Sequence, residues 1–205
     1  MARMDAANFG PRRPPFESEP RIMLSAYAVP EAFSPAECDA IIALSHEKDL
    51  ADAGLVGNRS DHNLRRAELA WLDDRDGGGW VMDRIMALVA EANRAHFDFA
   101  LTEFGESPQV ARYGAEREGH FVWHSDIGEG PLASRRKLTL VVQLSEGAEY
   151  LGGVLELQAD ANLRPSDRAR GSAVLFPSFV LHRVTPVTQG ERYSLTTWVH
   201  GPAFR

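Results

Sequence analysis

The chain has 205 residues, of which 44% are hydrophobic, and a formal net charge of −7 at pH 7. This length and composition predict one domain with a substantial core, and the negative charge argues against a general binder of nucleic acid or anionic membranes. Cys38 is the only cysteine, which excludes an intramolecular disulfide framework. Together with the lack of an apolar run of about 20 residues or of a signal-peptide pattern, this predicts a cytoplasmic protein.

The beginning of the chain is predicted to hold a leader, a strand and a helix. Residues 1–20 combine proline and arginine clusters with little apolar periodicity, so we expect a flexible leader followed by one domain over residues 21–205. Residues 23–29 are predicted to form a short strand. Ser34-Pro-Ala-Glu37 has the pattern of a capping box with proline at the first helical position, which predicts a helix over about 35–47.

A second, longer helix is predicted after the glycine run that ends at Gly79. It extends from Trp80 to about His96. Its apolar residues recur at helical spacing: Val81, Ile85, Leu88, Val89 and Ala92. We therefore expect one face of this helix to pack on a sheet.

After Pro108 the pattern changes to short β-rich runs. The predicted strands are 109–114, 119–126, 137–145, 153–158, 172–176, 180–187 and 191–199. Helices first, strands afterwards and no regular βαβ alternation favour a mainly β fold with N-terminal α-helices, namely a double-stranded β-helix of the jelly-roll type. We expect the last two strands to pair as a hairpin around Gln189-Gly190.

A metal site is the strongest functional signal in these strands. In an extended strand, His124 and Asp126 point to the same face, and His182 follows after enough strands to return the chain to that point. Two histidines and one carboxylate on one face of a metal leave positions open for other ligands, as in Fe(II) oxygenases. Arg192, in the next strand, would then present a planar fork to a carboxylate in the same cavity.

Each of these residues also has a purely structural interpretation. A His-x-Asp triplet is a weak motif, His182 lies in an apolar stretch that suits a core histidine, and Arg192 is compatible with a surface residue beside a turn. Their joint order and spacing favour the metal site over these separate explanations.

Taken together, these residues resemble the 2-oxoglutarate and Fe(II)-dependent dioxygenases, specifically the prolyl 4-hydroxylase-like branch, from about Ser34 to the C-terminus. Two further segments carry the resemblance: Tyr150-Leu-Gly-Gly-Val-Leu-Glu156 and Gly171-Ser-Ala-Val-Leu-Phe-Pro-Ser178. The resemblance implies the same jelly roll, with Fe(II) held by His124, Asp126 and His182. It also implies 2-oxoglutarate and dioxygen as cosubstrates, with ascorbate as a further candidate, and a pairing of Arg192 with the far carboxylate of 2-oxoglutarate.

Four more residues are candidates for contacts to the cosubstrate. Ser194 and Thr196 alternate with Arg192 along one strand, so a hydroxyl of either can reach the same carboxylate, and we favour Ser194. Tyr113 is a candidate too, with a half-buried strand aromatic as the equal alternative. Gln143 departs from the family, because relatives often carry there a tyrosine that contacts 2-oxoglutarate. We expect its amide to donate in place of that hydroxyl.

The implied activity is hydroxylation of an unactivated C–H bond, with release of succinate and CO2. A small-molecule or peptidyl substrate follows by analogy, and a prolyl or other amino-acid side chain, free or in a protein, is the favoured class. Trp123 and His120 are candidates for the cavity entrance. Arg135 and Arg136, in the glycine-containing segment after the metal motif, are candidates for an anionic substrate group. The loop from Leu50 to Arg66 is another candidate wall; it contains Asn58, Arg59, His62 and Arg65.

Other classes of protein remain as alternatives. A cupin-like metal-binding enzyme would explain the histidines but would not require Arg192, and a non-catalytic sensor or binding module would not require the intact ligand set. A zinc hydrolase would need a general base that the sequence does not reveal. The carboxylate of Asp126 argues against halogenation. The oligomeric state and the substrate itself stay open.

Overall fold

The computed structural model describes residues 25–48, 51–52, 55–56, 59–60, 64–73, 77–160 and 162–204. The predicted leader over residues 1–20 lies outside these ranges, as does part of the candidate wall between residues 50 and 66. Within the described residues, no helix combines the length and apolar character that crossing a membrane requires.

Both predicted helices are confirmed. Helix α1 (Pro35–His46) begins with the predicted capping box, in which Ser34 Oγ accepts from the Glu37 backbone N–H at 3.2 Å and Glu37 Oε2 accepts from the Ser34 N–H at 2.7 Å. Helix α2 (Gly79–Ala92) buries the whole predicted apolar stripe. Its last turn is π-helical (Asn93–Phe97) rather than α-helical, and it ends at Asp98 with φ of 55°.

The strands form two main antiparallel sheets. The major sheet contains, in order, β1 (Tyr27–Val29), β13 (Ala173–Pro177), β9 (Arg136–Gln143), β16 (Glu191–His200), β7 (Gln109–Gly114), β6 (Glu68–Trp71) and β2 (Ala51–Asp52). The minor sheet contains β12 (Arg164–Pro165), β11 (Leu155–Gln158), β14 (Leu181–Val184), β8 (His120–His124) and β5 (Arg65–Arg66). The remaining strands form two two-stranded sheets: β10 (Leu151–Gly152) with β15 (Val187–Gln189), and β3 (Leu55–Val56) with β4 (Arg59–Ser60).

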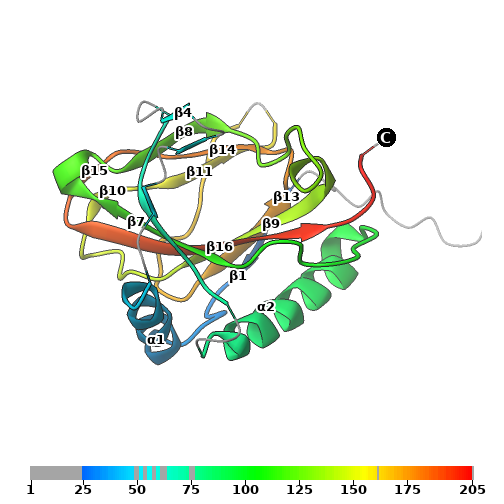
Figure 1. Cartoon of the computed structure of the whole chain (residues 1–205), viewed down its shortest axis with the longest axis horizontal. Coiled ribbons are helices and arrows are strands. Elements are labelled where there is room, and N and C mark those ends of the chain that lie inside the picture. Colours follow the sequence, from blue (N-terminus) through cyan, green and yellow to red (C-terminus); the bar gives the residue numbers. More distant parts are fainter. Residues whose placement is uncertain are drawn as a thin grey trace, which may run out of the picture.

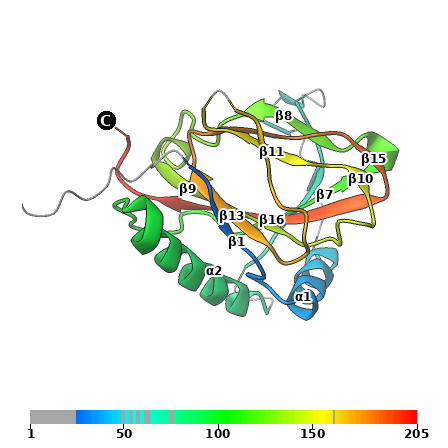
Figure 2. The same cartoon turned by 180° about the vertical axis from the view of Figure 1, so that it is seen from behind.

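The two sheets face each other, and both helices cover the far side of the major sheet (Figures 1 and 2). This arrangement is the predicted jelly roll with N-terminal helices. Alternate side chains of β9 divide the core: Leu138 and Leu140 pack with the helices, whereas Val141 packs between the sheets. Complete burial of such a side chain stabilises the fold by roughly 1.5–3 kcal/mol. The central strands β9 and β16 are therefore well placed to hold functional side chains on the face opposite the helices.

The predicted hairpin between the last two strands is wrong. Strand β14 pairs with β8 and β11 in the minor sheet, whereas β16 pairs with β7 and β9 in the major sheet. Pro186 has no backbone N–H with which to continue the ladder of β14, and the following strand β15 pairs with β10 instead. The chain thus crosses between sheets, so His182 and Arg192 approach the interior from opposite sides.

Candidate active site

An irregularity in β8 sets the position of the first histidine. His182 of β14 lies opposite His124 and Val184 lies opposite Phe121, so three steps along β8 correspond to two along β14. Such a β-bulge turns residues onto one face that regular alternation would place on opposite faces. The rings of Phe121 and His124 accordingly stack, with centroids 3.4 Å apart.

Asp126 lies in a bend after β8, not within an extended strand as predicted. Two backbone contacts fix this bend. The N–H of Asp126 donates to the Ser178 carbonyl at 2.9 Å, and Arg136 Nη1 donates to the Asp126 carbonyl at 3.1 Å. The chain after β8 is therefore tied to the residues that precede β14, which directs the carboxylate towards both histidines.

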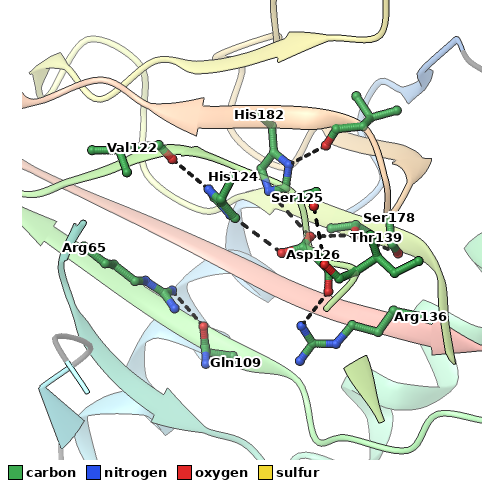
Figure 3. A network of polar contacts seen from close by, with 12 residues as sticks. Arg65, Gln109, Val122, His124, Ser125, Asp126, Arg136, Thr139, Ser178 and His182 are labelled. Atoms are coloured by element: carbon green, nitrogen blue, oxygen red, sulfur yellow. Dashed lines mark hydrogen bonds and ion pairs between the residues drawn. The ribbon is translucent and has the colours of Figure 1, made fainter. Parts of the chain in front are cut away.

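The side chains of His124, Asp126 and His182 converge on one point (Figure 3). His124 Nε2 is 3.6 Å from Asp126 Oδ1, and His182 Nε2 is 3.5 Å from Asp126 Oδ2. All three potential ligand atoms lie within 4.8 Å of one another. Two imidazole nitrogens and a carboxylate oxygen at this separation fit a single transition-metal ion with open coordination positions.

The backbone determines which nitrogen of each ring is available. His124 Nδ1 lies 2.8 Å from the Val122 carbonyl, and His182 Nδ1 lies 3.0 Å from the Val180 carbonyl. A carbonyl only accepts hydrogen bonds, so each Nδ1 carries the proton and each Nε2 presents a lone pair towards Asp126. This is the arrangement of metal-binding histidines, whose second nitrogen is usually held by a backbone or carboxylate oxygen.

The site also favours the protonation states that a metal requires. Burial, with the neighbouring His182, lowers the pKa of His124 to about 4. Burial would raise the pKa of Asp126, but the two histidines and the Thr139 hydroxyl outweigh it and hold that pKa below its ordinary value. Thr139 is fully buried and donates to Asp126 Oδ2 at 2.7 Å. At neutral pH the site therefore combines a neutral imidazole at His124 with an ionised carboxylate at Asp126.

Arg192 lies at the other end of the site, in β16, and is only 2% exposed. It pairs in register with Tyr113 of β7, whose ring centroid is 5.6 Å from the guanidinium carbon. Arg192 Nε donates to Gln143 Oε1 at 3.0 Å, and Nη1 donates to Ser194 Oγ at 3.3 Å. A neutral amide and a hydroxyl thus orient a buried cation without neutralising it.

Gln143 does not offer a donor to the cavity in this arrangement. Its amide nitrogen donates to the Ser145 carbonyl at 2.9 Å and to the Tyr150 hydroxyl at 3.0 Å. Both N–H groups are therefore committed, and the amide oxygen accepts from Arg192. The structure places Gln143 behind Arg192, where it orients the guanidinium, rather than in the donor position expected from the sequence.

One cavity of about 40 Å³ joins the two ends of the site. Its lining includes the predicted residues Asp126, His182, Arg192, Ser194, Thr196 and Tyr113. It also includes Arg65, which belongs to the candidate wall between residues 50 and 66, and three residues that the sequence did not point to: Gln109, Phe121 and Trp198. Trp198 continues the alternation of β16 from Arg192 and was predictable on that basis. Arg65 belongs to a two-residue strand, which has no recognisable periodicity.

The four candidate substrate residues lie outside the lining of this cavity. Trp123 stacks with Arg183, whose guanidinium carbon is 4.8 Å from the ring centroid, and His120 Nδ1 lies 2.7 Å from the Glu118 carbonyl. Arg135 pairs with Glu103 at 2.9 Å. Arg136 donates from Nε to Glu106 at 2.7 Å. The two arginines expected to meet an anionic substrate group are thus already paired with glutamates, and Arg136 also supports the Asp126 bend.

Comparison with known proteins agrees with this geometry. The family model of the 2OG-Fe(II) oxygenase superfamily matches residues 108–200, which contain the triad and Arg192. A PKHD-type hydroxylase of Synechococcus elongatus is 35% identical over 73% of this chain and 75% of its own length. A PKHD-type hydroxylase of Sphingopyxis alaskensis is 38% identical over 74% of this chain and 71% of its own length.

Two solved structures share the fold. A prolyl-4-hydroxylase of Pseudomonas putida has a TM-score of 0.66 and 22% identity, covering 85% of this chain and 91% of its own. A prolyl hydroxylase of Trichoplax adhaerens, in complex with a peptide fragment of the oxygen degradation domain of hypoxia inducible factor, has a TM-score of 0.70 and 18% identity. That match covers 85% of this chain and 83% of the other.

Proposed function

Because the chain belongs to the 2OG-Fe(II) oxygenase superfamily and is a 2-oxoglutarate-dependent hydroxylase, we propose that His124, Asp126 and His182 hold its Fe(II). Their convergence within 4.8 Å, at one end of a cavity that Asp126 and His182 line together with Arg192, is the observation that carries this assignment. The protonation states agree with it, since Fe(II) takes neutral imidazole and ionised carboxylate ligands. A cupin-like enzyme would not account for Arg192.

Arg192 is the proposed partner of the far carboxylate of 2-oxoglutarate. A planar guanidinium binds a carboxylate through two parallel hydrogen bonds, and such charge-assisted bonds are stronger than neutral ones. Ser194 and Thr196 face the same cavity from the same strand, so their hydroxyls are placed to add a contact, as is Tyr113. Gln143 acts behind them by fixing the direction of Arg192 Nε.

When Fe(II), 2-oxoglutarate and dioxygen are bound, they supply the oxidative decarboxylation that hydroxylates a C–H bond and yields succinate and CO2. The chain supplies the surroundings for this chemistry. Thr139 and the Ser178 carbonyl hold Asp126, while Phe121 and Trp198 contribute aromatic parts of the cavity wall. Inside the protein, fixed charges and dipoles act more strongly than they would in water.

The proposed substrate is a prolyl or other amino-acid side chain, either free or within a peptide. Support comes from relatives named PKHD-type hydroxylases and from the similar structures described as prolyl hydroxylases, one of which holds a peptide. The aromatic walls of Phe121 and Trp198 suit a compact apolar ring or chain. The cytoplasmic location and the boundary of the domain at residue 21 stay predictions.

Anaerobic visible spectroscopy tests the assignment without knowledge of the substrate. The apoprotein is titrated with Fe(II) and then with 2-oxoglutarate, and we expect a metal-to-ligand charge-transfer band. Arg192→Met should still bind Fe(II) but require much more 2-oxoglutarate for the same band. Iron binding without any band in the wild-type protein would contradict the proposed function.

A further inference from the structure

The cavity contains a second arginine, Arg65, which none of the assigned roles uses. It lies in β5 at the edge of the minor sheet, where Arg65 pairs with Phe121 and Arg66 with His120. Strand alternation turns Arg65 into the cavity. Arg66 faces the other way, where its Nη1 lies 3.4 Å from both the Arg117 carbonyl and Glu118 Oε2. The position of Arg65 is therefore set by the sheet.

The guanidinium of Arg65 is incompletely satisfied. Its Nη2 donates to Gln109 Oε1 at 2.8 Å, and its carbon lies 4.7 Å from the centroid of the Phe121 ring (Figure 3 shows the pairing with Gln109). Among the described residues, its Nε is buried without a hydrogen-bond partner. Buried polar groups are nearly always paired, so a buried N–H left open beside a cavity indicates a position for a ligand acceptor.

The side chains of Arg65 and Arg192 have similar surroundings. Each lines the same cavity, donates to a glutamine amide oxygen, and lies against an aromatic ring. Neither contacts a carboxylate within the part of the chain that the structure describes. Many other described arginines do pair with carboxylates: Arg66, Arg112, Arg135, Arg136, Arg164, Arg170 and Arg183. The two cavity arginines thus keep their charge available, and Arg192 is already assigned to one carboxylate.

With Fe(II) and 2-oxoglutarate bound, the charged groups around the cavity would sum to a net charge of about +1. Asp126 offsets one of the two guanidinium groups, and the double charge of Fe(II) is equal and opposite to that of 2-oxoglutarate. An uncompensated cation that is partly removed from water carries a desolvation cost, and a bound anion offsets that cost. We propose that Arg65 binds a carboxylate of the primary substrate, so that this enzyme selects substrates with a carboxylate close to the carbon that is hydroxylated. This inference rests on the proposed function, because it assumes that Arg192 takes the cosubstrate.

Two kinds of substrate present such a carboxylate. One is the α-carboxylate of a free amino acid or of a peptide C-terminus, and the other is an acidic side chain next to the target residue. Matched acid and amide probes separate them. N-acetyl-L-proline and its amide test the first source, whereas the dipeptide amides N-acetyl-Pro-Asp-NH2 and N-acetyl-Pro-Asn-NH2 test the second.

The experiment uses the full chain loaded anaerobically with Fe(II) and 2-oxoglutarate. The charge-transfer band is recorded first, and each probe is then titrated while the change in the band and the melting temperature are followed. In at least one pair we expect the acid to bind at least about 10-fold more tightly than the amide, consistent with a charge-assisted hydrogen bond. Arg65→Met should abolish this preference, whereas Arg183→Met, on the outer face of the minor sheet, should retain it.

The melting temperature distinguishes binding from a structural role. If Arg65 serves a ligand, its buried and unpaired Nε does not stabilise the apoprotein, and Arg65→Met should melt no lower than the wild type. A clear decrease would indicate a structural residue and contradict the inference. Arg65→Gln, which retains N–H donors without the charge, serves as a second variant and should also lose the preference for acids.

The outcomes separate the two proposals. A wild-type protein that forms the band, yet binds acid and amide equally in both pairs or shows no saturable response to either acid, would overturn the Arg65 inference alone. A preference that persists in Arg65→Met and Arg65→Gln would do the same. Failure of the wild-type protein to form the band would overturn the proposed function, and the inference with it.

Discussion

The two ends of the cavity are built in different ways. At the metal end, His124 depends on a bulge in β8 and Asp126 on a bend tied to Ser178, so local irregularities place the ligands. At the other end, Arg192 lies in a regular part of β16, in register with Tyr113 of β7 and two residues before the pairing with β9 begins at Ser194. The metal end therefore depends on a few contacts between residues distant in the sequence, whereas the arginine end follows directly from sheet register.

Loss of the carboxylate should have the largest effect. In Asp126→Ala, Fe(II) loses its anionic ligand, and the two imidazoles lose the group that both face. Substitution of groups that merely support a ligand typically costs 10–100-fold in metal affinity, so we expect a loss of more than about 100-fold here. Fe(II) titration followed by spectroscopy measures it. Ser125→Ala is the matched control, because Ser125 is outside the triad, and an equal loss in that variant would contradict the assignment.

Removal of the Arg192 guanidinium should weaken cosubstrate binding while leaving iron binding nearly unchanged. In Arg192→Met, the ligand triad is untouched, so Fe(II) affinity should remain within about 3-fold of the wild type. A hydrogen bond to a charged group contributes about 1.5–3 kcal/mol, so the 2-oxoglutarate requirement should rise roughly 10–150-fold. Titration of the charge-transfer band gives both values. A matched loss of iron and cosubstrate binding would show instead that the two ends form one cooperative unit.

This difference also explains what the sequence could predict. Arg192 was identified by its spacing after His182, and Ser194 and Thr196 by strand alternation from Arg192; the structure places all three on one cavity lining. The sequence analysis correctly grouped His124 with Asp126 but assigned them to a continuous strand, because a bulge and a bend leave no periodic signal. The hairpin prediction failed because pairing partners depend on the whole sheet. Arg65 was placed in a candidate wall but received no role of its own, because a two-residue strand shows no periodic pattern.

The hydroxyl of Thr139, which supports Asp126, allows a test with a smaller expected effect on iron binding. Thr139→Val keeps the shape of a fully buried side chain but removes the hydrogen bond to Asp126 Oδ2. We expect Fe(II) affinity to fall about 10-fold, the lower part of the range for such supporting groups, with little change at the Arg192 end.

The neighbouring strand offers a matched control for this substitution. Thr197 is equally buried, but within the described residues its hydroxyl has no hydrogen-bond partner. Thr197→Val should leave Fe(II) affinity unchanged and should maintain or raise stability, because it removes an unsatisfied polar atom. Equal effects of the two valine variants on iron binding would mean that general packing, rather than the contact to Asp126, supports the site.

The smallest effect that separates the two ends concerns acid stability of the metal-free protein. His124 has a pKa of about 4 in the fold, against an ordinary value of 6.5. Between these values the unfolded chain binds a proton that the folded chain does not, so the free energy of unfolding should decrease as the pH falls through this window, by at most about 1.4 kcal/mol per pH unit. The lowered pKa of Asp126 adds a further loss of unfolding free energy as the pH falls below its ordinary value of 3.8.

Urea unfolding with a chelator at pH 7, 6 and 5 measures how steeply the free energy of unfolding changes with pH. This slope should be smaller in His124→Gln. Arg192→Met should retain the wild-type slope, because Arg192 contacts an amide, a hydroxyl and a phenol ring rather than an imidazole or a carboxylate. An unchanged slope in His124→Gln would show that the acid sensitivity arises away from the metal end.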